Sequence, residues 1–154
     1  MRLGFRIKHY FFSAFRELFV HHHGSLEFRA KIFALLIAAC DKPNVQNYIV
    51  VKKLAEEIYL GDKERADLLM LSTKEIVQKV KDNNGLDLDT LVENIQKELK
   101  IVPRYAKKIN VPALQPFLEI TYDTNVRSYQ ENILEFLQNL KDETLKIKEK
   151  NKDT

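Results

Sequence analysis

The chain has 154 residues, 45% of them hydrophobic, which suffices for one ordinary core, and no Gly/Ser-rich or Pro-rich linker divides it. Only four Gly and four Pro argue against a fold of many short β-strands, because its turns need both residues. We therefore expect a single all-α domain. The formal net charge of +3 arises within residues 1–23, and the balanced remainder argues against nucleic-acid binding.

Residues 3–19 have the pattern of an amphipathic helix with a basic face. Their longest uncharged run, residues 9–15, is far below the roughly 20 apolar residues that span a bilayer. Arg16 and Glu17 stand where a signal peptide would carry its cleavage site. Two interpretations remain open, a helix in a membrane interface and a helix packed on the chain's own core or on a partner. The candidate binding residues are Arg2, Arg6, Phe11, Phe12, Phe15, Arg16 and Phe19.

The most apolar stretch lies in residues 25–60. Residues 32–40 are all apolar, so a helix formed by them has no polar face to expose to solvent and must be surrounded by other helices. Residues 41–44 then break the run, and Tyr48, Val51, Ala55 and Ile58 recur at helical spacing. We expect a central helical hairpin. Its lone cysteine, Cys40, has no disulfide partner in the chain, and we expect a buried, unreactive thiol in a reducing compartment such as the cytoplasm.

Polar residues and prolines divide the rest of the chain. Gly61 is expected to end one helix in a left-handed conformation, and Asp62 and Asp87 to cap the next two. Short helices are predicted at residues 104–109 and 113–122, among three prolines, and a last helix begins after residue 123. Apolar spacing fades after residue 141, so residues 142–154 are predicted to be a frayed, charged tail.

Two acidic loops share a short sequence pattern. Residues 41–48 are echoed, with one deletion, by residues 123–129, and each copy follows an apolar helix and precedes an amphipathic one. We therefore expect one bundle built from two helix–acidic loop–helix units facing each other across a pseudo-twofold axis.

The same loops carry a family resemblance. Residues 25–141 resemble the tellurite-resistance TerB-like helical domain, especially the version that precedes the J domain of membrane-anchored DnaJ-like co-chaperones. The resemblance implies an all-α bundle of about seven helices with the acidic loops brought together, which in some members hold a divalent metal. The matching motifs are Ala38-Ala39-Cys40-Asp41, Gly85-Leu86-Asp87-Leu88-Asp89 and Phe117-Leu118-Glu119-Ile120-Thr121-Tyr122-Asp123.

The chain departs from the family pattern where a metal would bind. Lys42 and Thr124 replace the glycine that follows each aspartate, and neutral residues replace the acid expected in the next helix. Asp41 and Asp123 are thus the only candidate ligands, too few for a calcium-type site, and we expect helix caps there and no cofactor. The J-domain signature His-Pro-Asp is absent from the 154 residues, so stimulation of a chaperone ATPase is not expected.

The sequence shows no catalytic constellation, neither a phosphate-binding glycine loop nor a paired nucleophile and base, so we expect no enzyme. We expect a non-catalytic module that binds another protein at the cytoplasmic face of a membrane, in a bacterium the inner membrane. It would comprise a basic helix (residues 1–23), a TerB-like domain (24–141) and the tail (142–154). The alternative is a soluble stress or metal-response domain of the tellurite-resistance type. Binding of a divalent metal ion at micromolar affinity would favour this alternative if the binding were lost when Asp41 and Asp123 are changed.

Residues 1–20 are predicted to attach the protein reversibly to anionic membranes. Each basic residue near such a surface contributes about 1 kcal/mol, and buried phenylalanine rings add to this. Co-sedimentation with acidic vesicles at low salt should depend on residues 1–20. If the intact protein ignores the vesicles while deletion of residues 1–20 lowers the melting temperature, the segment packs on the protein instead.

Overall fold

The computed structural model describes residues 24–82 and 87–152, and these ranges contain helices but no β-strand, which confirms the all-α prediction. The N-terminal binding residues predicted above, from Arg2 to Phe19, lie outside the described residues. The helices are α2 (Gly24–Ala38), α3 (Val45–Ile58), α4 (Lys63–Lys81), α5 (Leu88–Ile101), the 3-10 helix η1 (Pro103–Lys108), α6 (Val111–Glu119) and α7 (Thr124–Lys152).

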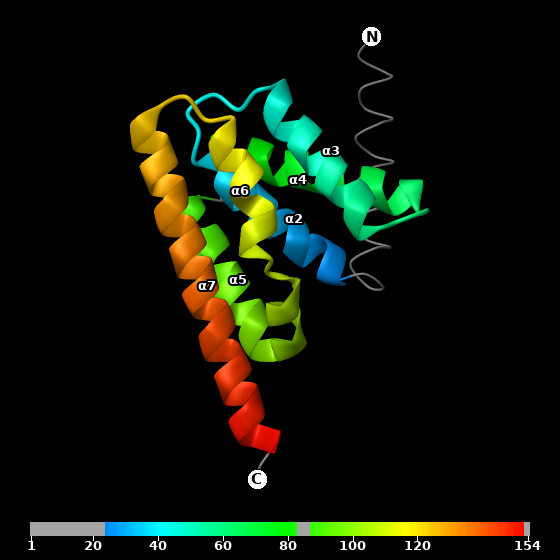
Figure 1. The fold of residues 1–154 in the computed structure, drawn as a ribbon, viewed down its shortest axis with the longest axis vertical. Coiled ribbons are helices and arrows are strands. Elements are labelled where there is room, and N and C mark those ends of the chain that lie inside the picture. The colour runs from blue at the N-terminus through cyan, green and yellow to red at the C-terminus, as the bar shows by residue number, and fades with distance from the viewer. Residues whose placement is uncertain (1–23, 83–86, 153–154) are drawn as a thin grey trace.

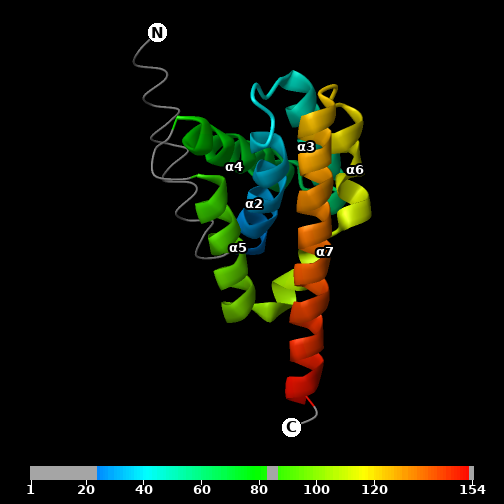
Figure 2. The ribbon, with the colours of Figure 1, turned by 90° about the vertical axis from the view of Figure 1, so that its left-hand side faces the viewer.

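Helix α2 is the centre of the bundle. It lies inside the bundle in Figure 1, and Figure 2 shows α4 and α5 on one side of it and α6 and α7 on the other; it also contacts η1. Every residue from 32 to 38 is buried, as the uninterrupted apolar run predicts. Lys31, just before this run, reaches outward, and its Nζ lies 2.9 Å from Oε1 of Glu98 on α5.

The prediction that α2 and α3 pack against each other as a central hairpin is wrong. Helix α3 packs chiefly on α4 and also on α6, while α4 makes the main contact with α2. The predicted apolar face of α3 is right at Val51 and Ala55, which are fully buried. Asn47 and Leu54 are buried as well, while Tyr48 is only partly buried and Ile58 is exposed. An amphipathic helix has only one apolar face to bury, and here α4 and α6 cover it.

Short polar side chains set the starts of α4 and α5, as predicted. Oδ1 of Asp62 accepts the backbone N–H of Arg65 at 3.1 Å, and Oδ1 of Asp87 accepts that of Thr90 at 2.7 Å. The hydrogen bond from the Thr90 N–H stabilises the carboxylate and lowers the pKa of Asp87. Gly61, between α3 and α4, has φ of +78°, the left-handed conformation expected of it.

The C-terminal third differs from the predicted boundaries. Helix α6 begins two residues earlier and ends three earlier than the predicted 113–122, because Asn110 caps it and Pro112 is tolerated in its first turn. Helix α7 continues to Lys152, so most of the predicted frayed tail is helical, though its side chains are largely exposed. Both views show this end projecting beyond the bundle (Figures 1 and 2). Among the described helices, none combines the length and apolar character that crossing a bilayer requires.

The two-unit arrangement about a pseudo-twofold axis stays a prediction. What the structure does place together is the loop at residues 39–44 and the loop at residues 120–123, which line one cavity.

We predict that Leu36→Ala lowers the free energy of unfolding by about 2–5 kcal/mol, because the fully buried side chain leaves a cavity in the middle of α2. Leu60→Ala is the matched control, since Leu60 is 84% exposed and its truncation should change stability by less than about 0.5 kcal/mol. Urea denaturation measures both, and a loss below about 1 kcal/mol for Leu36→Ala would mean that α2 is not the core.

Candidate functional site

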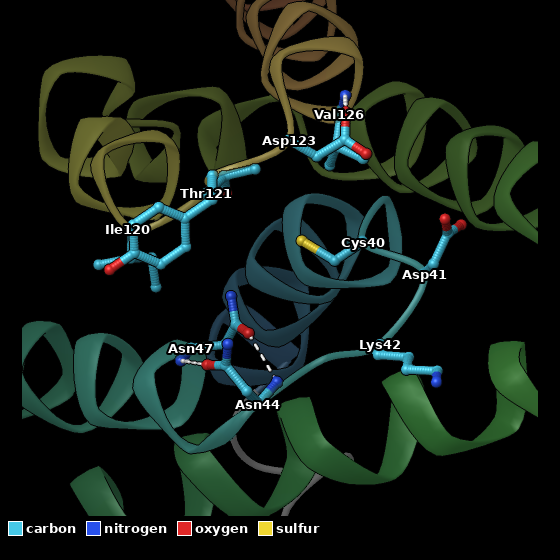
Figure 3. A pocket seen from close by; sticks show the side chains of 10 residues that line it. Cys40, Asp41, Lys42, Asn44, Asn47, Ile120, Thr121, Asp123 and Val126 are labelled. Carbon is cyan, nitrogen blue, oxygen red and sulfur yellow. Dashed lines mark hydrogen bonds between the residues drawn. The ribbon is translucent and has the colours of Figure 1, made fainter.

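A cavity of about 190 Å³ lies between the two acidic loops, and we call it the two-loop cavity. Figure 3 shows it between the end of α2, the start of α3 and the segment joining α6 to α7. The first loop and α3 contribute Cys40, Asp41, Lys42, Asn44 and Asn47, and the second loop and α7 contribute Ile120, Thr121, Tyr122, Asp123 and Val126.

One wall of the cavity is formed at the C-terminus of α2, where the last backbone carbonyls need hydrogen-bond donors from other elements. The last carbonyls of a helix lack intrahelical donors, and Cys40 N–H here bonds to Ile37 O, which leaves Leu36 O without its usual partner. Nε2 of Gln130, a fully buried residue of α7, donates to Leu36 O at 3.1 Å and approaches Cys40 Sγ at 3.6 Å. Nζ of Lys81, from α4, donates to the carbonyls of Ala38, at 3.0 Å, and Cys40. Two distant helices therefore hold this end of α2.

The opposite wall is built in a similar way at the C-terminus of α6. The Thr121 hydroxyl donates to Phe117 O at 2.8 Å, which closes the last turn. The guanidinium of Arg127, one turn into α7, donates from Nε to Thr121 O at 3.1 Å and contacts the same oxygen through a second nitrogen. A basic side chain thus meets the carbonyl end of each helix that points at the cavity, an arrangement that the helix dipole favours.

Of the two aspartates predicted to be helix caps, Asp123 is one and Asp41 is not. Oδ1 of Asp123 accepts the backbone N–H groups of Asn125, at 2.9 Å, and Val126, at 3.3 Å, so this residue does cap α7. Asp41 does not cap α3, because Asn44 lies nearer to the first turn. The Asn44 side chain accepts the N–H of Asn47, and Oδ1 of Asn47 accepts that of Asn44 at 2.9 Å, which forms a reciprocal capping box (Figure 3).

The lining residues fit a divalent metal poorly. No group of three or more His, Cys, Asp or Glu side chains gathers within residues 24–82 and 87–152. Calcium takes six to eight oxygen ligands, roughly, while Asp123 already accepts two backbone N–H groups and Asp41 stands beside Lys42. The structure therefore adds no acidic, histidine or cysteine ligand cluster to the two aspartates on which the metal-binding hypothesis rests.

Cys40 differs from the sequence-based expectation, because its thiol is only partly buried and lines the cavity. Burial raises the pKa of the Cys40 thiol, and this outweighs the Thr121 hydroxyl and the positive charge of Lys81, which lower it. The neutral thiol is the less nucleophilic form, and the residues lining the cavity include no histidine to act as a base.

Comparison with models of known families, with curated proteins and with solved structures finds no significant match. The resemblance to the TerB-like domain therefore stays a prediction from the sequence motifs.

Sequence reasoning missed four side chains that shape the cavity. Gln130 occupies a core position of α7, in step with Val126, Ile133 and Leu137, and one polar residue in such a stripe is a signal that could have identified it. Asn44 and Asn47 have the spacing of a capping box, which could also have been recognised. Lys81 offered no signal, because its partners lie more than 40 residues away in the sequence.

We predict that Lys81→Met destabilises the fold by about 1 kcal/mol, because it removes charge-assisted hydrogen bonds to the end of α2 at a solvent-exposed position. Lys79→Met is the matched control in the same helix, where the long 3.5 Å pair with Glu75 should contribute at most about 0.5 kcal/mol. Thermal denaturation of both variants measures the difference, and equal losses would show that the contact of Lys81 with α2 has no special role.

Proposed function

We propose that the bundle is a non-catalytic module that binds another protein through the surface around the two-loop cavity. The observation that carries this proposal is the exposure of large apolar side chains beside the cavity. Tyr122, a lining residue, is 93% exposed, and Val45, which follows the lining residue Asn44, is 71% exposed. Ile49 lies one turn further along α3 and is 52% exposed. We call Val45, Ile49 and Tyr122 the apolar rim.

An exposed aromatic ring beside a concave, mostly uncharged surface is typical of protein interfaces, where tyrosine often contributes a large share of the binding free energy. Scattered apolar side chains are common on protein surfaces, but Tyr122 lines the cavity, and Val45 and Ile49 belong to the same first turns of α3 as the lining residues Asn44 and Asn47. Burial raises the pKa of the Cys40 thiol, which disfavours the nucleophilic thiolate and supports the non-catalytic part of the proposal.

The proposal includes attachment to the cytoplasmic face of a membrane through residues 1–20. Its support is the sequence pattern alone, in which all the net positive charge of the chain falls within residues 1–23 beside a phenylalanine-rich face. In this arrangement the N-terminal segment provides location, and the apolar rim provides specificity for the partner.

The immobilised wild-type chain is used to capture its partner from native cells. We predict that a Val45→Ser/Tyr122→Ser double variant captures at least tenfold less of that partner, because both changes remove apolar area from the rim. The matched control is Leu60→Ser/Ile101→Ser, which changes two equally exposed apolar residues outside the cavity lining. Quantitative mass spectrometry compares the captured proteins. Equal capture by both double variants and the wild type would refute an interface at the cavity.

A further inference from the structure

Basic side chains gather where α5 ends and η1 follows it. Residues 97–108 contain five basic residues and one acidic residue, although residues 24–154 as a whole hold equal numbers of each. The one acidic residue, Glu98, is engaged by Lys31 of α2, whose Nζ lies 2.9 Å from its Oε1. We call the five basic residues the basic end, and all of them are exposed: Lys97, Lys100, Arg104, Lys107 and Lys108.

The side chains of the basic end form no ion pair with a carboxylate of residues 24–82 or 87–152. Helical spacing places Lys97, Lys100 and Ile101 together on the face of α5 opposite to its buried residues. Arg104 and Lys107 are three residues apart in a 3-10 helix, so they share one side of η1. Neighbours at such spacings are closer than a Debye length, about 8 Å at physiological salt, so their charges act together.

An apolar side chain protrudes among these charges. Ile101, the last residue of α5, is 79% exposed and is followed three residues later by Arg104. A single exposed isoleucine is common, but basic residues around an exposed aliphatic side chain suit the interface of an anionic membrane. Nucleic acid fits less well, because Ile101 offers no ring on which a base can stack. The nearby Tyr105 ring packs against Phe28 of α2, with 5.4 Å between the ring centroids.

The basic end lies close to the point where residues 1–23 join the bundle. Helix α2 begins at Gly24, and a Cβ atom placed on Gly24 would come within 2.5 Å of the Tyr105 hydroxyl oxygen, so the start of α2 lies against η1. Both views show the turn from α5 to η1 at the end of the bundle away from the loops at residues 39–44 and 120–123 (Figures 1 and 2). A membrane that binds residues 1–20 is therefore near the basic end and distant from the two-loop cavity.

We propose that the basic end is a second contact of this protein with an anionic membrane surface. Its lysines and arginine meet the acidic lipid headgroups, and Ile101 enters the boundary between headgroups and acyl chains. The inference rests on the membrane attachment that is part of the proposed function, and it names the face of the bundle that meets the lipid. Because either contact brings the other to the surface, the two together bind more strongly than one alone. The apolar rim then faces away from the lipid and is open to a partner.

The test is co-sedimentation of the full-length protein, at low salt, with vesicles of phosphatidylcholine and phosphatidylserine. Vesicles of phosphatidylcholine alone are the control for charge. The variant Lys97→Gln/Lys100→Gln/Lys107→Gln removes three charges from the basic end. The matched control removes three exposed lysines from α3 and α4, and it is Lys52→Gln/Lys53→Gln/Lys63→Gln.

Each basic residue near an anionic surface strengthens binding by about fivefold. We therefore expect the basic-end variant to bind the acidic vesicles at least tenfold more weakly than the wild type, and the matched control less than threefold more weakly. Melting temperatures should be unchanged, because all six lysines are exposed. Equal affinities of the two variants, or equal binding of the wild type to both kinds of vesicle, would overturn the inference.

Ile101→Ser tests the apolar part of the contact. We expect it to weaken binding to the acidic vesicles at least threefold, because less apolar area leaves water at the membrane. Leu60→Ser is the matched control, since Leu60 is 84% exposed and lies between α3 and α4. Neither change touches the apolar rim, so partner capture should be unaffected. Equal vesicle binding by the two variants would refute the insertion of Ile101.

The inference and the proposed function fail in different ways. Arg2→Gln/Arg6→Gln/Arg16→Gln removes three charges from the N-terminal segment. If only this variant loses vesicle binding, residues 1–20 attach the protein and the inference is wrong. If only the basic-end variant loses it, the basic end stands and attachment through residues 1–20 is wrong. Failure of the wild type to bind acidic vesicles refutes both. Binding of single-stranded RNA or poly-L-glutamate that requires the basic end, without vesicle binding, would overturn the assignment to a membrane.

Discussion

The bundle depends on enclosing a helix that has no polar face in its second half. An apolar helix gains free energy wherever it is removed from water, but its C-terminal carbonyls still need donors once they are buried. The chain meets both requirements with residues from other elements. Helices α4, α5, α6 and α7 cover the sides of α2, and Gln130 and Lys81 supply donors to its last carbonyls. The two demands together determine how the other helices must lie.

The two-loop cavity follows from this way of ending α2. Because α2 stops at Ala38 and its end is held by α4 and α7, the chain leaves the core at residues 39–44 and starts α3 against different neighbours. Helix α6 ends close by, and Arg127 donates to the carbonyl of Thr121, just beyond its last turn. Two helix ends and two helix starts thus converge, and side chains do not fill all the space between them. The loops are well placed to vary in chemistry while the helices keep their packing.

The lining of the two-loop cavity combines hydrogen-bonding groups with apolar side chains. The two carboxylates that suggest metal binding in the sequence have other environments in the fold, since Asp123 caps α7 and Asp41 adjoins Lys42. The other lining groups include two amides, Lys42, the Thr121 hydroxyl, a thiol whose pKa is raised by burial, and apolar side chains.

Periodicity and capping residues by themselves determined the helical class, the uniform burial of residues 32–38, and the starts of α4 and α5, because these follow from contacts within a few residues. Only the tertiary structure decided which helix covers α2, since many amphipathic helices present equivalent apolar faces to the same core. It likewise decided that Asn44 and not Asp41 caps α3, and that Asn47 turns inward. The hydrogen-bond partners of Lys81 and Gln130 were the least predictable from the sequence. These bonds join residues that are 41 to 94 positions apart, and no local pattern encodes such separations.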